Sequence, residues 1–199
     1  AWAEKNYPSV PKKLLITKTK EITSVPGTIK KIMFLGGEPL MTNRHKKFLK
    51  KIKNKHQVAV TYNTNGTFEL DSETIELLDE FKNVNFIVSI DGFGALNDRV
   101  RSGSRWAEIV EFIDQVDDLD FDISIHTTIH VNNWFGLIDL SKFVERMKLP
   151  WTTNVLTYPE KLDIINLSPE DKIELQAILE QTNVPNKDYI SNHIKKGTQ

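Results

Sequence analysis

The chain has 199 residues, of which 39% are hydrophobic and 27% charged, and its formal net charge is −1. This is the composition of an ordinary globular domain, so it excludes extensive disorder and collagen-like sequence, and no apolar run approaches the roughly 18 residues of a membrane span. Cysteine is absent, which excludes disulfides, a cysteine nucleophile and thiolate ligands within these residues.

Short β-rich runs alternate with longer amphipathic segments along the chain. The predicted strands are residues 30–35, 57–62, 84–90, 121–130 and 152–157. Helices are predicted over 42–54, after an N-cap at Asp71, over 104–117, over 134–147 with Phe135, Ile138 and Phe143 buried, and after an N-cap at Ser168. Strand–helix units in series predict an α/β fold with a parallel sheet, either doubly wound or part of a (βα) barrel. Both place ligands at the carboxyl ends of the strands.

Positive charge is concentrated near the start of the chain. Residues 1–60 contain 14 Lys and Arg against 3 Asp and Glu, and residues 44–55 are the densest basic run. That run either binds an acidic partner or a phosphate backbone, or solvates one face of a helix that buries Phe48, Leu49 and Ile52. The second interpretation is favoured, because the run lacks base-reading and interleaved aromatic side chains.

The first predicted strand ends in Gly36-Gly37-Glu38-Pro39. Glycine leaves the backbone open to a ligand, Glu38 adds a carboxylate, and Pro39 has no N–H donor. This group of acceptors suits an ammonium group. A plain strand-to-helix turn, with Pro39 at the helix start, explains the same residues equally well.

Polar residues also follow the next two strands. Asn63-Thr64-Asn65-Gly66 is typical of an Asn-Gly turn. Ser89 and Asp91 share one face of the third strand, where they either hold a ribose or another polar group or, for Asp91, cap a turn. In the following loop, the Arg101 guanidinium suits a carboxylate or phosphate, although a solvated loop arginine is the simpler interpretation.

The five histidines give weaker signals. His126 and His130 lie on the polar face of the fourth strand, but four residues along a strand span about 13 Å, too far for one metal ion. His126 is a substrate-pocket residue or, as we favour, a satisfied interior histidine. His45, His56 and His193 are expected at the surface.

Together these strand ends resemble the radical S-adenosylmethionine (SAM) superfamily. GGEP at 36–39 is similar to the motif that receives the SAM amino group, and TNG at 64–66 and SIDG at 89–92 are similar to the next two strand ends. The downstream sequence resembles twitch-domain members most. The resemblance implies a parallel (βα) partial TIM barrel of the radical SAM type.

The resemblance also implies which residues bind the cofactor and the substrate. Gly36, Gly37 and Glu38 would contact the amino group, Ser89 the methionine carboxylate or ribose, Arg101 the carboxylate, and backbone near Leu156 the adenine. The implied SAM site comprises Gly36, Gly37, Glu38, Pro39, Ser89, Asp91, Arg101 and Leu156. Thr64, Asn65 and His126 would lie towards the substrate, and no metal ligand is assigned.

One family element has no counterpart here. The family holds a 4Fe–4S cluster through Cys-x3-Cys-x2-Cys after its first strand, and this chain has no cysteine. We expect truncation: residues 1–29 follow the absent cluster loop, 30–182 form the barrel without its first strand, and 183–199 form a tail. Natural loss of the cluster is the alternative.

The expected function follows from the resemblance. It is reductive cleavage of SAM to a 5′-deoxyadenosyl radical that abstracts hydrogen from an unidentified peptide, cofactor precursor or nucleotide, with this chain inactive alone. The alternative is a cluster-free module that binds an acidic partner or nucleic acid. A plain nucleotide-binding domain is disfavoured, because Gly-x-Gly-x-x-Gly and a phosphate loop are absent. We expect a cytoplasmic protein without membrane contact, in which the unpaired first strand is open to self-association.

Overall fold

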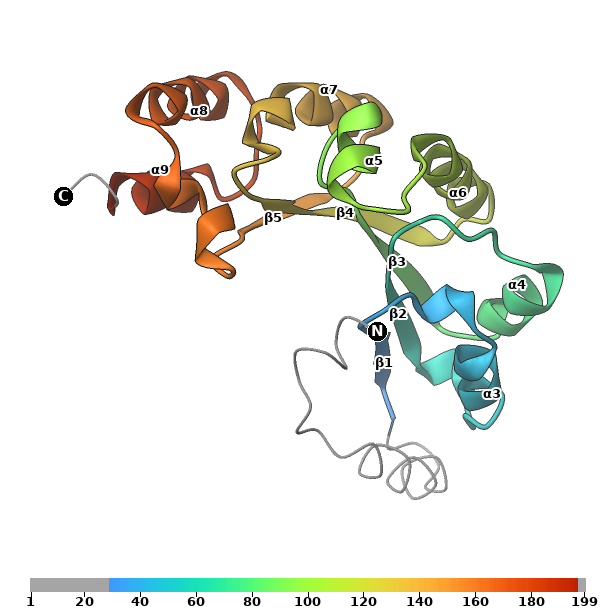
Figure 1. The fold of residues 1–199 in the computed structure, drawn as a ribbon. Helices are drawn as coiled ribbons and strands as arrows, with labels where there is room; N and C mark the ends of the chain where they lie inside the picture. Colours follow the sequence, from blue (N-terminus) through green and yellow to red (C-terminus); the bar gives the residue numbers. More distant parts are fainter. Residues whose placement is uncertain (1–28, 197–199) are drawn as a thin grey trace.

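The computed structural model describes residues 29–196, so the expected N-terminal segment lies outside the description except for Ile29. Five parallel strands form one sheet in the order β1-β2-β3-β4-β5. They are β1 (Lys31–Phe34), β2 (Ala59–Thr64), β3 (Asn83–Ser89), β4 (Asp122–Ile129) and β5 (Trp151–Val155). The sheet curves, with helices along its convex side (Figure 1). This arrangement confirms the predicted parallel (βα) partial barrel.

Helical segments follow each strand. They are η1 (Pro39–Met41), α3 (Arg44–Leu49) and η2 (Lys55–Gln57) after β1; α4 (Ser72–Asp79) after β2; α5 (Ala95–Val100) and α6 (Trp106–Asp118) after β3; η3 (Trp134–Gly136) and α7 (Leu137–Met147) after β4; and η4 (Glu160–Leu162), η5 (Ile164–Asn166), α8 (Pro169–Gln181) and α9 (Lys187–Lys196) after β5. Neither α5 nor α9 was predicted from the sequence. Residues 183–199, expected to be a tail, thus contain a helix that buries Ile190 and Ile194.

Two helix starts agree with their predicted caps. The Asp71 carboxylate accepts from Thr74 N at 2.8 Å, and the Ser168 hydroxyl accepts from Asp171 N at 3.0 Å, so each satisfies a backbone donor of the first turn. One predicted core residue is wrong: Phe135 is 45% exposed. It lies in the 3₁₀ turn η3, whose shorter repeat changes which side chains share a face.

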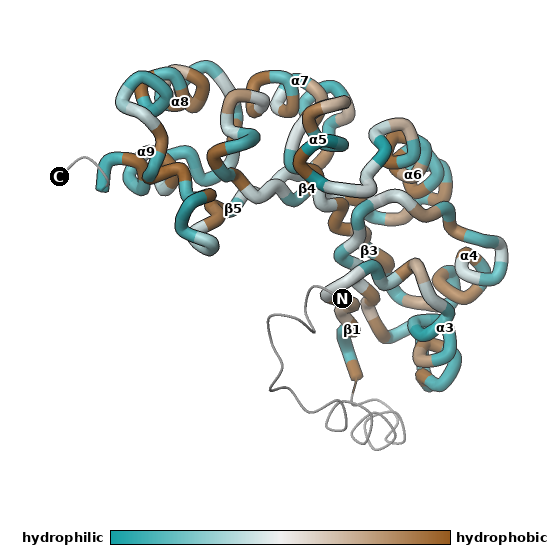
Figure 2. Tube along the Cα trace, viewed as in Figure 1, coloured by the Kyte–Doolittle hydropathy of each residue, from teal (hydrophilic) through white to brown (hydrophobic). Residues whose placement is uncertain are grey.

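Alternate strand residues and the inward stripes of the helices form the main core. Its centre is a stack of three rings, with Tyr62 lying 4.8 Å from Phe34 and 5.2 Å from Phe86 between ring centroids. Leu78 of α4 and Ile113 of α6 are buried in the same core. Hydrophobic residues recur at intervals along α4, α6 and α7 (Figure 2). This core packs one face of the sheet against the helices. The strand residues between the core positions therefore point their side chains to the opposite, concave face.

The outer edge of β5 is covered by the segment that leads into α9. Asn186, with φ 58°, donates from Nδ2 to Thr153 O at 3.0 Å. The Thr153 hydroxyl donates to Pro185 O at 2.6 Å. At the other edge, β1 pairs with β2 and with no second strand among residues 29–196, and Met33 and Leu35 are 45% and 62% exposed. The two sheet edges are therefore unlike.

Of the histidines expected at the surface, His45 is buried and His193 is half-buried. His45 is 4% exposed, with Nδ1 2.9 Å from the Tyr62 hydroxyl. His193 lies 2.7 Å from the Asp163 carboxylate, and its prediction failed because α9 was missed. His56 is exposed, as predicted. Burial, reinforced by the charge of neighbouring Lys46, lowers the pKa of His45 from its ordinary value of 6.5, so the ring is neutral in the folded protein at pH 7.

We expect acid to destabilise the fold through His45. Below about pH 6.5 the unfolded chain binds a proton that the folded chain excludes, so the free energy of unfolding falls with pH and levels off below the lowered pKa. Urea unfolding at pH 7.5 and 5.5 measures this loss. The loss should be smaller in His45→Gln, whose amide can still form a hydrogen bond with Tyr62 but does not titrate; equal losses in both proteins would contradict the assignment.

Candidate functional site

The β1 end exposes backbone beside a carboxylate. Gly36 and Gly37 have φ of 80° and 60°, a conformation that favours glycine. A Cβ built on either would meet nothing within 4 Å. Glu38 caps η1 by accepting from Leu40 N at 3.1 Å, and Pro39 begins that turn. The segment is thus a strand-to-helix turn and also an open group of acceptors.

Glu38 ties the end of β1 to the end of β2. Its carboxylate accepts from the Thr64 hydroxyl at 2.9 Å and from Asn65 N at 2.7 Å. The Thr64 oxygen also accepts from Gly66 N at 3.1 Å, and Thr64 is only 2% exposed. Thr64, expected to face the substrate, is therefore placed to position Glu38.

Arg101 ties the end of β2 to the end of β3. Its Nη2 donates to Asn65 Oδ1 and its Nη1 to Asp91 Oδ2, both at 2.6 Å. The other Asp91 oxygen accepts from Thr128 N at 2.7 Å, which extends the connection to β4. Charge-assisted bonds of this kind are among the stronger ones in proteins.

Two buried asparagines complete this arrangement, and sequence analysis missed both. Asn97 of α5 accepts from Asp91 N at 2.9 Å. Asn133 donates to the carbonyls of Asp91 and Thr128, both at 2.8 Å. An asparagine in a polar loop carries no sequence signal of burial. We call the connected set the strand-end network: Glu38, Thr64, Asn65, Asp91, Asn97, Arg101, Thr128 and Asn133.

Two cavities adjoin the network and share Asp91 and Val100. One, of about 740 Å³, extends over the ends of β4 and β5. The other, of about 790 Å³, lies beside Asn65 and Arg101. The first cavity is also lined by Arg99, His130, Phe135 and Leu156. Leu156, the expected adenine neighbour, therefore borders the same space as Asp91.

Ser89 and His126 lie outside the network. The Ser89 hydroxyl donates to Asn63 Oδ1 at 3.0 Å, and His126 Nδ1 is 2.9 Å from the Thr152 hydroxyl. These side chains point to the concave face and form a second polar group next to the first. The structure thus brings together five of the predicted site residues and leaves Ser89 and His126 in a row of their own. The five are Glu38, Thr64, Asn65, Asp91 and Arg101.

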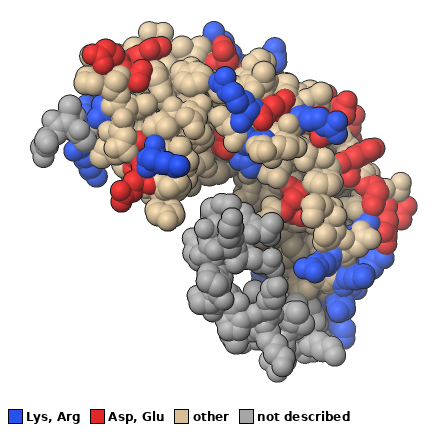
Figure 3. All heavy atoms as spheres, in the orientation of Figure 1, with Lys and Arg blue, Asp and Glu red and all other residues tan. Residues whose placement is uncertain are grey.

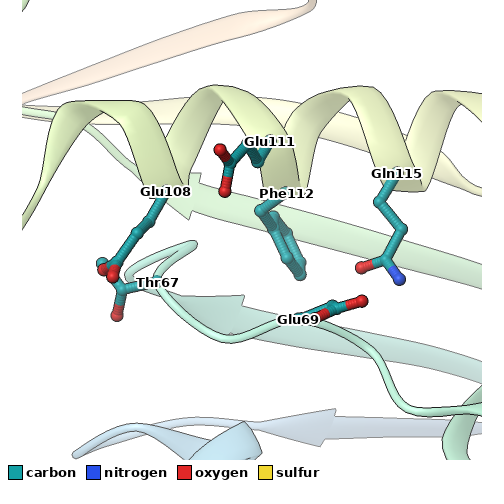
Figure 4. Close-up of a pocket in the computed structure, with 6 residues that line it drawn as sticks. All are labelled: Thr67, Glu69, Glu108, Glu111, Phe112 and Gln115. Carbon is teal, nitrogen blue, oxygen red and sulfur yellow. The ribbon is translucent and has the colours of Figure 1, made fainter.

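A further cavity contains none of the predicted site residues. It measures about 450 Å³ and lies between α6 and the loop after β2, where Glu69, Glu108 and Glu111 line it (Figure 4). Across the described residues, no group of three or more His, Asp or Glu side chains could hold a metal ion.

Three of the seven Lys and Arg residues in the basic run at 44–55 form ion pairs within the fold. Lys46 lies 2.7 Å from Asp71 and 2.9 Å from Glu73, and Lys55 lies 2.8 Å from Glu80. Basic side chains over α3 lie beside acidic ones over α4 (Figure 3). The neighbouring Lys46 holds the pKa of the Asp71 carboxyl well below its usual range. The run therefore stabilises the contact between α3 and α4.

Fold and site together define a partial parallel β/α barrel with a network of polar side chains at the carboxyl ends of its strands. The family model described as "Radical SAM superfamily" matches residues 2–144. The chain therefore belongs to the radical SAM superfamily. No curated protein matches it.

Solved structures show the same fold. Native anSMEcpe with bound AdoMet is 15% identical, with a TM-score of 0.62 over 82% of this chain and 49% of that one. SuiB of Streptococcus suis bound to S-adenosylmethionine is 18% identical, with a TM-score of 0.54 over 77% of this chain and 38% of that one. This chain thus spans half or less of either structure. No helix in the described part has the length and apolarity to cross a membrane.

The residues present fit one of the two cofactors that the superfamily implies. The 199 residues contain no cysteine, so they offer no thiolate for a 4Fe–4S cluster. They do fit SAM. Exposed glycine backbone and the Glu38 carboxylate offer hydrogen-bond acceptors, and Arg101, which bonds to Asn65 as Glu38 does, offers donors.

The Asp91–Arg101 pair should couple strongly in folding. We expect Asp91→Asn to lower the free energy of unfolding by about 1–3 kcal/mol, because it leaves a half-buried guanidinium without its counter-charge. Urea unfolding of Asp91→Asn, Arg101→Met and the double variant measures the coupling. Arg99→Met, at an exposed neighbour, is the control, and additive effects of the two changes would refute the pairing.

Proposed function

We propose that this chain binds SAM at the strand-end network and forms the larger part of a radical SAM catalytic domain of the twitch-domain type. The observation that carries the proposal is that Glu38 and Arg101 both bond to Asn65, next to two cavities that share Asp91. The titles of two solved structures of the same fold record bound AdoMet and S-adenosylmethionine.

The geometry supports a separate role for each end of the ligand. Three donors occupy the Glu38 carboxylate, and a carboxylate offers about four acceptor sites, so the remaining one and the glycine carbonyls suit the ligand's ammonium group. A guanidinium has five donors, which leaves Arg101 able to bind the ligand's carboxylate as well as Asp91. The cavity lined by Asp91 and Leu156 suits ribose and adenine.

The chemistry itself depends on a group that this chain does not hold. With a reduced cluster whose ligands come from outside these 199 residues, bound SAM supplies a 5′-deoxyadenosyl radical for hydrogen abstraction. This chain's contribution is orientation: the network holds the ends of β1 to β4 in fixed relation before the ligand arrives, which lowers the cost of ordering the site.

A peptide is the substrate class that the neighbouring structures favour. The titles of two of them record anSMEcpe with the Cp18Cys peptide and SuiB with the precursor peptide SuiA. We propose a peptide ahead of a nucleotide or a cofactor precursor, because the concave face of the sheet presents neutral hydrogen-bonding side chains such as Asn63, Ser89 and Thr152.

SAM binding can be measured on the chain itself. Calorimetry should detect binding by the wild type and at least about tenfold weaker binding by Glu38→Gln and by Arg101→Met, a loss of about 1.4 kcal/mol each. Glu111→Gln in the outer cavity is the matched control and should bind like the wild type. Absence of wild-type binding, or unchanged affinity in both site variants with retained circular dichroism, would refute the assignment.

The chain alone should not cleave SAM. With dithionite and SAM added, chromatography and mass spectrometry should find no 5′-deoxyadenosine above the protein-free control, because no residue here ligates the cluster that passes the electron. Steady product formation by a verified cysteine-free sample would contradict the proposal.

A further inference from the structure

A row of uncharged polar side chains crosses the concave face just inside the strand ends. Ser89 and His126 are register partners on β3 and β4, as are His126 and Thr152 on β4 and β5. Asn63 joins the row from β2 by accepting the Ser89 hydroxyl at 3.0 Å. Asn154 borders His126 on the other side. We call Asn63, Ser89, His126, Thr152 and Asn154 the concave row.

The contacts of His126 favour one tautomer of its ring. The Thr152 hydroxyl has a single proton, which it donates to Ile125 O at 3.3 Å. With that proton given to Ile125, the hydroxyl oxygen accepts from His126 Nδ1 at 2.9 Å, an arrangement in which Nδ1 carries the ring proton. The Asn154 amide nitrogen, which can only donate, lies 3.5 Å from Nε2. The Asn154 contact needs an unprotonated Nε2, and the Thr152 arrangement agrees with it.

An unprotonated Nε2 presents a lone pair to the concave face. The Asn154 contact is at the outer limit of a hydrogen bond, so a ligand donor at ordinary distance would replace it. The row has no Lys or Arg to neutralise an anion, and the nearest network cation, Arg101, is bound to Asp91 and Asn65. An anionic group placed here would lose hydration without a counter-charge.

We propose that His126 determines substrate specificity by accepting, at Nε2, a hydrogen bond from a neutral donor of the substrate, an amide N–H or a hydroxyl. The inference rests on the proposed function, because it makes the concave row the substrate side of the SAM site. Thr152 acts as the positioning residue that fixes the acceptor form of the ring. Carboxylate and phosphate groups are excluded from this position.

Nitrogen-15 spectra of histidine-labelled chain test the tautomer directly. At pH 7.5 the His126 ring should show a protonated Nδ1 and an unprotonated Nε2. Thr152→Ser, which keeps the hydroxyl, should preserve this pattern, whereas Thr152→Val should lose it and move towards the Nε2-protonated form. A protonated Nε2 in the wild type, or no difference between the two variants, would overturn the proposal.

The ligand class is tested with simple probes on the SAM-saturated chain. N-acetyl-alanine-N-methylamide should shift the His126 Nε2 resonance, and acetate and inorganic phosphate at equal concentration should not. A shift from either anion, or none from the amide, would overturn the proposal. Calorimetry of SAM binding on the same samples separates the proposed SAM site from the proposed role of His126. If the chain does not bind SAM but Nε2 is unprotonated, the result counts against the SAM site only.

Discussion

One amide residue, Asn65, holds two opposite charges in place, and the arrangement of the strand ends depends on it. Its backbone N–H binds Glu38 and its side-chain oxygen binds Arg101. A carboxylate and a guanidinium that are partly removed from water need such partners, because an unpaired charge there is costly. Glu38 lies before β2 and Arg101 lies after β3. Because both bond to Asn65, this residue fixes the distance between the two charges.

The apolar core and the polar strand ends stabilise different parts of the fold. The ring stack of Phe34, Tyr62 and Phe86 sets the spacing of the first three strands from the helix side. The network then aligns the strand ends, with Asn97 and Asn133 reaching in from the connecting segments to hold the backbone of Asp91. Rigid strands with satisfied polar ends are a suitable base for a binding site.

Sequence patterns predicted the features that depend on local chemistry. Strand periodicity and caps predicted the parallel sheet and the helix starts at Asp71 and Ser168, and the resemblance to the radical SAM family implied that Glu38 and Arg101 lie in one region. Features that depend on tertiary contact were missed. The six-residue α5 follows Gly94 without a side-chain cap, and His45 is buried because α3 packs its first turn against the ring stack. Neither leaves a periodic signal in the sequence.

The unequal edges of the sheet limit how copies of this chain could add to one another. At β5 the Asn186 amide takes the place of a neighbouring strand by bonding to Thr153 O, so an arriving strand would first have to displace it. At β1, no residue of the described range 29–196 takes such a place, and Met33 and Leu35 are exposed. Among the described residues, a second copy could therefore add more readily at β1 than at β5, and two copies joined through β1 would expose only their covered β5 edges.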